Sequence, residues 1–308
     1  MLEERDKWAL RLVAGIPSLG EFTDGEGGLS RLLRERQDST LSWRGRRIHL
    51  ERFRADGSAP TVLFHHGFGA YGALYGPFLG RLALEGINVV AIDRPGHGLS
   101  EGRRGDCTVA GLADITRLVI EDVVGPTSRA VVVFGSSAGG MLTSCMIPYI
   151  DDVVDGYICH GVHDPAHARR FLGQLVARFA EAVPRARYPY RLLPRHIRRG
   201  ISTHAVMREW FRPGSDRLAA LSPTLRSVFS MTVAYRPPRP PSAVSRPVLV
   251  LTGRDDRMVS AAQSTQSARR LGLSNLEVEI LEGGHMLLHE EPQQVLSAIA
   301  RWLSRITA

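Results

Sequence analysis

The chain contains 308 residues, of which 44% are hydrophobic and 23% charged, as is usual for soluble globular enzymes. No apolar run approaches the roughly 18 residues that a membrane-spanning helix needs, so we expect no stable membrane insertion. The formal net charge is +8 and comes almost wholly from arginine, because Lys7 is the one lysine. These arginines are spread along the chain without a nucleic-acid-binding motif, so we expect no nucleic-acid partner.

The cysteines and the first residues of the sequence indicate the cellular compartment in which we expect the protein to work. Cys107, Cys145 and Cys159 are scattered without metal-binding spacing, and an odd, sparse set favours a reducing environment. Residues 1–6 include acidic side chains, and the apolar segment of a secretory signal does not follow them. We therefore expect a cytoplasmic protein.

The hydrophobic pattern divides the chain into three parts. Residues 1–40 contain short amphipathic segments and predict a helical arm that docks on the core. Residues 41–160 and 242–308 alternate strand and helix patterns and predict the core itself. Residues 161–241 show helical periodicity but no clear buried strand, which is typical of a lid or an inserted subdomain.

Short, nearly continuous apolar runs predict strands that are buried on both faces of a parallel sheet. A half-exposed strand comes first, and the whole set of predicted strands is 48–53, 61–65, 89–93, 130–134, 153–159, 247–252 and 276–281. Helical segments are expected at 74–84, 109–123 and 261–271. Strands and helices in alternation imply right-handed crossovers, and hence an α/β fold with a doubly wound, mostly parallel sheet.

The strongest chemical signal is a Gly-x-Ser-x-Gly motif at 135–139, with Ser137 at its centre. It follows a buried strand directly and precedes a helix, so the glycines allow a tight turn that exposes the Ser137 hydroxyl. The start of the following helix also brings backbone N–H groups and a positive dipole end close to that hydroxyl. Ser137 is therefore the candidate nucleophile.

A serine nucleophile needs a base, and the base needs an acid that fixes its tautomer. His285 lies between the last predicted strand and the final helix, at the sheet edge where open α/β sheets place their ligands. Asp255 and Asp256 follow the strand at 247–252, at the same edge. Only one of two adjacent side chains can face His285, and the order Ser, Asp, His matches a known hydrolase arrangement.

These motifs resemble the α/β-hydrolase superfamily over about residues 45–160 and 242–306. The resemblance implies the α/β-hydrolase fold, with a helical lid inserted after the sixth strand. It also implies that Asp256, the third residue after the strand-end glycine, is the triad acid. The sequence His66-Gly67-Phe68 matches a loop that supplies an oxyanion donor, which assigns the Phe68 N–H as one donor and the Ala138 N–H as the other.

The loop at 93–102 resembles the monoacylglycerol lipase and lysophospholipase branch of this superfamily. In that branch the loop packs beneath the nucleophile, so His97 is expected to be structural, as are His65 and His66. The sequence departs from the branch at Ser136, where histidine is frequent before the nucleophile.

Three histidines, His160, His163 and His167, begin the predicted lid. With Asp164 they could form a metal site, but their spacing fits one helix only in part and no acid is placed as general base. We therefore expect no metal and no other cofactor. Asp164 remains an alternative triad acid, because some members of the superfamily carry the acid after this strand.

The sequence thus predicts a serine hydrolase that cleaves a carboxylic ester with an apolar acyl part, through an acyl-enzyme on Ser137. The apolar lid helix favours such a substrate, while the many lid arginines could attract an anionic one or simply be solvated. An amidase, a thioesterase and an acyltransferase would use the same triad. A non-hydrolytic ligand-binding protein of the same fold is a further alternative. The partner is a small acyl substrate, and a homodimer is left open.

Overall fold

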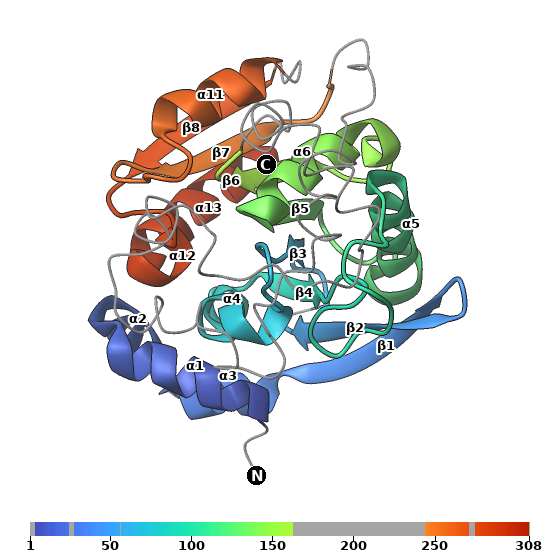
Figure 1. Ribbon diagram of the computed structural model, residues 1–308, viewed down its shortest axis with the longest axis horizontal. Helices are drawn as coiled ribbons and strands as arrows, with labels where there is room; N and C mark the ends of the chain where they lie inside the picture. Colours follow the sequence, from blue (N-terminus) through green and yellow to red (C-terminus); the bar gives the residue numbers. More distant parts are fainter. Residues whose placement is uncertain (1–3, 25–27, 56, 163–243, 271–274, 308) are drawn as a thin grey trace, which may run out of the picture.

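The computed structural model describes residues 4–24, 28–55, 57–162, 244–270 and 275–307 (Figure 1). Within them one eight-stranded sheet has the order β1-β2-β4-β3-β5-β6-β7-β8. Strand β2 pairs antiparallel with β1 and β4, and every other pairing is parallel. The predicted α/β fold with a doubly wound, mostly parallel sheet is therefore confirmed.

The strands are β1 (Gln37–Trp43), β2 (Arg46–Phe53), β3 (Thr61–His65), β4 (Asn88–Ile92), β5 (Val131–Ser136), β6 (Gly156–His160), β7 (Val248–Gly253) and β8 (Leu276–Leu281). The N-terminal helices are α1 (Glu4–Gly15), α2 (Pro17–Thr23) and α3 (Gly28–Glu35). The helices of the core are the 3-10 turn η1 (Gly72–Tyr75), α4 (Gly76–Leu84), α5 (Val109–Val119), the π-helical turn η2 (Ile120–Val124), α6 (Ala138–Ile150), α11 (Ala261–Arg270), α12 (Leu287–Glu290) and α13 (Pro292–Ile306).

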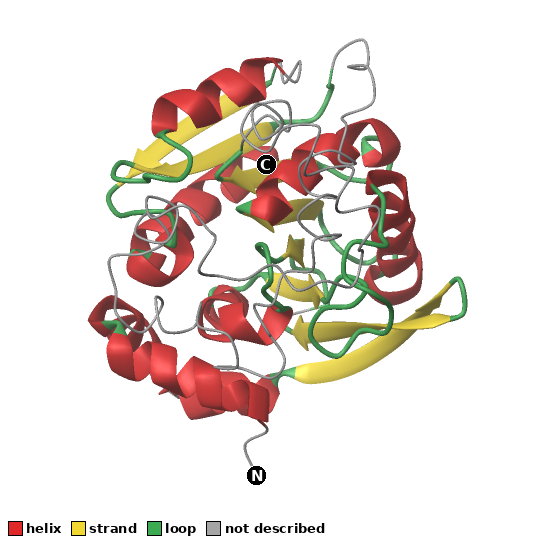
Figure 2. Cartoon of the chain, in the orientation of Figure 1, coloured by secondary structure: helices red, strands yellow, loops and turns green. Residues whose placement is uncertain are grey.

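Helices cover both faces of the sheet (Figure 2). Successive strand residues point to opposite faces, so one strand contributes to both apolar layers. On β5, Val132 and Phe134 pack with α4 and α13, whereas Val131 and Val133 pack with α5 and α6. Such two-sided burial explains why the central strands read as continuous apolar runs.

The helices α1 and α2 belong to the first of these layers. Trp8 and Leu12 of α1 and Leu19 and Phe22 of α2 are buried there. The next element differs from the expected helical arm, because β1 begins at Gln37. Only Leu41 and Trp43 of β1 are buried, so this edge strand carries too little apolar signal to be recognised from its sequence.

The predicted lid at 161–241 lies almost wholly outside the described residues, which resume at Val244. Its place in the chain is clear, since β6 and β7 are neighbours in the sheet and flank this segment. Because the central strands run parallel, their carboxyl ends meet at one edge of the sheet. The ends of β3, β5, β6 and β7, together with the loop that follows β8, build the candidate site there.

Candidate active site

Ser137 occupies the turn between β5 and α6, and its backbone is held in an unusual conformation. Its φ of 55° and ψ of −116° lie where side-chain-bearing residues are rarely found. Two hydrogen bonds hold it there: its N–H donates to the His160 carbonyl at 2.8 Å, and its carbonyl accepts from Met141 N–H at 3.0 Å. Such strain persists only where the surroundings impose it, and it is commonly found at functional sites.

The glycines around Ser137 are required by close packing. A Cβ atom on Gly135 would lie 2.1 Å from the Gly139 carbonyl oxygen, and one on Gly139 would lie 2.0 Å from the His65 carbonyl oxygen. No residue that carries a Cβ atom could therefore occupy position 135 or 139 without a shift of the backbone. The motif therefore lets the start of α6 rest directly against the ends of β5 and β3.

The structure brings together Ser137, His285 and Asp256, the three residues that the sequence analysis singled out. Ser137 Oγ lies 2.8 Å from His285 Nε2. His285 Nδ1 lies 2.8 Å from Asp256 Oδ2. With the proton on Nδ1 donated to the carboxylate, Nε2 faces the hydroxyl as a hydrogen-bond acceptor. Ser137, His285 and Asp256 thus form a continuous hydrogen-bonded line from the candidate nucleophile to the candidate acid.

Asp256 is fixed as an ionised carboxylate by its surroundings. Its side chain is fully buried, and Oδ1 accepts hydrogen bonds from Met258 N–H at 2.7 Å and Val259 N–H at 2.9 Å. Burial alone would raise the pKa of Asp256, but the charge and hydrogen bond of His285 and the Val259 N–H together hold it below its ordinary value. Its neighbour Asp255 is exposed.

The two residues expected to stabilise an oxyanion lie next to Ser137 in the chain and in the neighbouring loop after β3. Ala138 is the first residue of α6, so its N–H belongs to the unpaired amino end of that helix. Phe68 follows Gly67 in the loop after β3, and a Cβ atom on Gly67 would lie only 3.7 Å from Ser137 Cβ. Both residues therefore lie close to Ser137, and their role as oxyanion donors stays a prediction.

The histidines expected to be structural are buried and hydrogen-bonded within the core. His65 Nε2 lies 3.2 Å from Thr116 Oγ1, and His97 Nδ1 lies 3.2 Å from the Pro95 carbonyl. Burial lowers the pKa of His65 to about 3, and burial with the nearby Arg94 charge holds the pKa of His97 far below its usual range. These rings are neutral, and within the described residues their hydrogen bonds go to Thr116 and Pro95 and not to Ser137.

His160 of the possible metal-binding trio lies at the end of β6, while His163, Asp164 and His167 fall outside the described residues. The His160 ring is buried, its Nδ1 is 3.1 Å from Ser136 Oγ, and its centre is 5.8 Å from that of His285. Burial and the charge of His285 lower the pKa of His160 to about 3. The His160 ring is therefore neutral and packs close to the His285 ring.

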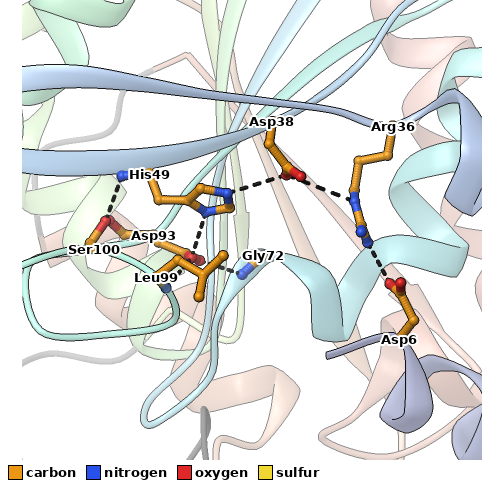
Figure 3. Close-up of polar contacts among 8 residues, drawn as sticks. All are labelled: Asp6, Arg36, Asp38, His49, Gly72, Asp93, Leu99 and Ser100. Carbon is orange, nitrogen blue, oxygen red and sulfur yellow. Dashed lines mark hydrogen bonds and ion pairs between the residues drawn. The ribbon is translucent and has the colours of Figure 1, made fainter. Parts of the chain in front are cut away.

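One group of described residues has the spacing of metal ligands: Asp38, His49 and Glu51 offer donor atoms within 4.8 Å of one another. His49 does not suit a metal, because both ring nitrogens face carboxylates. Nδ1 is 2.9 Å from Asp93 Oδ2, and Nε2 is 3.2 Å from Asp38 Oδ1 (Figure 3). Burial opposes protonation, but these two hydrogen bonds and the charges of Asp93 and Glu51 raise the pKa of His49 to about 9. A doubly protonated imidazole has no lone pair to give a metal.

The His49 network joins the N-terminal helices to the core. Asp38 lies 3.9 Å from the Arg36 guanidinium, which in turn binds Asp6 of α1 at 2.7 Å (Figure 3). This network is not recognisable from the sequence, since its members are far apart in the chain. The same is true of the role of Arg94, whose buried side chain contacts the loop that carries Phe68.

Comparison with known proteins fits this geometry. Residues 62–298 match the Alpha/beta hydrolase family. The chain belongs to this family, and it is a hydrolase. It is 27% identical over 275 residues to 2-(acetamidomethylene)succinate hydrolase of Mesorhizobium japonicum, with 84% of this chain and 94% of that protein covered. It is 25% identical over 272 residues to pimeloyl-(acyl-carrier protein) methyl ester esterase of Stenotrophomonas maltophilia, with 84% and 98% covered.

Among solved structures, the hydrolase has the fold of a soluble variant of monoglyceride lipase from Saccharomyces cerevisiae. The TM-score is 0.68 at 16% identity, with 89% of this chain and 96% of that chain covered. The expected resemblance to the α/β-hydrolase superfamily is thereby confirmed. None of the helices in the described part of the chain combines the length and the apolar character that a membrane crossing requires.

Proposed function

We propose that this hydrolase cleaves a carboxylic ester with an apolar acyl part, through an acyl-enzyme on Ser137. Ser137 Oγ attacks the ester carbonyl carbon while its proton passes to His285 Nε2. The Phe68 and Ala138 N–H groups bind the oxyanion that forms. When the intermediate collapses, the alcohol leaves with the proton from His285. Water then attacks the acyl-enzyme, again through His285, and releases the acid.

The observation that carries this proposal is the line of two 2.8 Å hydrogen bonds that joins Ser137, His285 and Asp256. It supplies a nucleophile, a base of the correct tautomer and an acid that stabilises the imidazolium as it forms. The strained backbone of Ser137 supports the assignment further, because it directs the hydroxyl out of the sheet at the edge where ligands bind.

The ester is favoured by the relative from Stenotrophomonas maltophilia, which is named as a methyl ester esterase. The apolar acyl part rests on the apolar pattern within residues 161–241 of the sequence. A second candidate reaction is amide hydrolysis, because the relative from Mesorhizobium japonicum is named for an acetamido compound. Both reactions pass through the same acyl-enzyme, so they differ in the leaving group that the site accepts.

A fluorophosphonate probe tests the serine chemistry directly, since it reacts only with an activated serine. We expect the wild type to be labelled at Ser137 and Ser137→Ala to remain unlabelled. Ser144→Ala is the matched control, because Ser144 lies on the same helix and its hydroxyl donates to the Met141 carbonyl of its own turn at 2.7 Å. Folded wild type without labelling would exclude the serine hydrolase and leave a non-hydrolytic ligand-binding protein.

The substrate class is tested with matched nitrophenyl esters and nitroanilides that carry short, medium and long acyl chains. We expect ester hydrolysis to rise with chain length, and Ser137→Ala to lower kcat by a factor of about 10⁴ or more. Faster turnover of the anilides would assign an amidase instead. Equal rates for all acyl chains would contradict the apolar acyl part while leaving the serine chemistry intact.

A further inference from the structure

Arg94 is a buried arginine whose guanidinium contacts the loop between β3 and η1. It follows Asp93 at the end of β4, and only 4% of its surface is exposed. Its Nη1 donates to the His66 carbonyl at 2.6 Å and its Nη2 to the Gly67 carbonyl at 2.9 Å. Its backbone N–H donates to His66 Nε2 at 3.2 Å. The side chain therefore binds two successive carbonyl groups of the loop that leads to Phe68.

The direction of the Phe68 N–H follows from these contacts. The Gly67 carbonyl and the Phe68 N–H belong to one peptide group, and the described chain contains no cis peptide bond. In a trans peptide the two groups point in opposite directions. The Gly67 oxygen accepts from Arg94 Nη2 at 2.9 Å, from His66 Nδ1 at 2.8 Å and, more weakly, from the Ala70 N–H at 3.3 Å. Arg94 supplies the charged donor of this set, and an oxygen held in place fixes the N–H on the other side of the same peptide plane.

His66 completes a consistent set of hydrogen bonds with Arg94. Its Nδ1 donates to the Gly67 carbonyl, so its Nε2 is free of a proton and accepts from the Arg94 backbone. A protonated His66 would present an N–H to the Arg94 N–H and lose this contact. Burial, and then the charge of Arg94, hold the pKa of His66 well below its ordinary value. Arg94 thus also preserves the neutral ring that shares the Gly67 oxygen.

We propose that Arg94 is a positioning residue for catalysis, which aims the Phe68 N–H at the oxyanion by holding the carbonyl groups of His66 and Gly67. This inference rests on the proposed function. A guanidinium suits the task because its planar fork places two donors at a fixed separation, and charged donors make the stronger hydrogen bonds. Lysine has the charge but lacks the fork.

The test uses Arg94→Met and Arg94→Lys. An oxyanion donor acts mainly in the transition state, so we expect kcat of Arg94→Met to fall by a factor of about 10² to 10³ while KM changes little. Affinity for a trifluoromethyl ketone, which forms a tetrahedral adduct with serine, should fall in parallel. Affinity for the product acid should not. Arg94→Lys should lie between the wild type and Arg94→Met.

Arg117→Met is the matched control. Arg117 also binds a backbone carbonyl with its guanidinium, through Nε at 2.9 Å and Nη2 at 2.6 Å to Tyr149. Its hydrogen bonds within the described residues go to Tyr149 and Asp152 and not to the loop after β3. We expect its kcat to stay at the wild-type value. This comparison separates a general loss of an arginine–carbonyl contact from the specific loss of the oxyanion donor.

The possible outcomes are distinct. A folded Arg94→Met with wild-type kcat and wild-type ketone affinity would overturn the inference and leave the proposed function standing. Failure of both Arg94 variants to fold would assign Arg94 to stability and would also overturn it. A wild type that neither reacts with the fluorophosphonate nor binds the ketone would instead contradict the proposed function itself.

Discussion

Two buried aspartate–histidine pairs lie on this sheet, and they differ in one partner. In the first, Asp256 binds Nδ1 of His285 at 2.8 Å. In the second, Asp93 binds Nδ1 of His49 at 2.9 Å. Both aspartates follow a parallel strand and accept hydrogen bonds from two backbone N–H groups. Asp256 accepts from Met258 and Val259. Asp93 accepts from Gly72 and Leu99. The aspartate side of the two pairs is therefore nearly the same.

The difference lies at Nε2 of each histidine. His285 Nε2 faces the Ser137 hydroxyl, a group that can donate a proton. His49 Nε2 faces the Asp38 carboxylate, which can only accept one. Two carboxylates hold His49 as an imidazolium, with its pKa raised to about 9 against the opposing effect of burial. The same kind of pair thus leaves His285 as the candidate base and makes His49 a fixed positive charge, according to the group that faces Nε2.

The largest expected effect comes from replacing each aspartate by asparagine. Asp256→Asn should lower kcat by a factor of about 10⁴, because the amide donates to His285 and favours the wrong tautomer. We expect the free energy of unfolding to change far less than kcat. Asp93→Asn should change kcat little but lower the free energy of unfolding by about 3 to 5 kcal/mol, because it breaks a buried ion pair. Ester hydrolysis and urea denaturation of each variant measure the two effects.

The folded fraction of Asp256→Asn and of Asp93→Asn is measured as the control. The kcat of each variant is then calculated per folded molecule. If Asp93→Asn loses as much corrected activity as Asp256→Asn, His49 takes part in catalysis and the division of roles is wrong. If Asp256→Asn keeps wild-type activity, Asp256 is not the triad acid. Asp164 would then become the candidate.

The charge of His49 predicts an alkaline loss of stability. Its pKa in the folded chain, about 9, lies above the ordinary value of 6.5, so its contribution is fully present below pH 6.5 and is lost as the pH rises through about 9. A shift of this size corresponds to at most about 3 kcal/mol. Urea denaturation across this range should show the decline in the wild type.

His49→Gln is the variant that isolates this decline. It should be less stable than the wild type at pH 6.5, but it should lack most of the further loss up to pH 9. The buried Cys107 thiol, whose pKa burial raises to about 12, adds its own loss of stability near and above pH 9, because it ionises in the unfolded chain. That loss is the same in the wild type and in His49→Gln, so the difference between them reports His49. Equal pH slopes for the wild type and His49→Gln would show that His49 is not the group that titrates.

The site was more predictable from the sequence than the groups that support it. Ser137, His285 and Asp256 stand in short motifs at strand ends, and parallel strands bring those ends together whatever the details of packing. Arg94 also lies in such a motif, but its side chain binds backbone carbonyl groups. Every residue has a backbone carbonyl, so residue types do not indicate which ones Arg94 binds. The His49 network draws on four distant segments, and its edge strand β1 has only two buried side chains. Antiparallel edge pairing and buried charge are set by tertiary contacts, so local patterns do not predict them.

The smallest expected effect is the most direct test of the third partner. Asp38→Asn keeps the hydrogen-bond acceptor at His49 Nε2 but removes its charge. Because the Asp38 side chain is 41% exposed, we expect the stability at pH 6.5 to fall by less than about 1 kcal/mol. The pKa of the His49 ring, followed by NMR titration, should nevertheless fall clearly below 9, since the bond to Asp38 is the largest effect that raises it. Hydrolysis by the Ser137 site should not change. A His49 pKa that stays at 9 would show that Asp93 alone fixes the charge, and the contrast with His285 would then need a cause other than the group at Nε2.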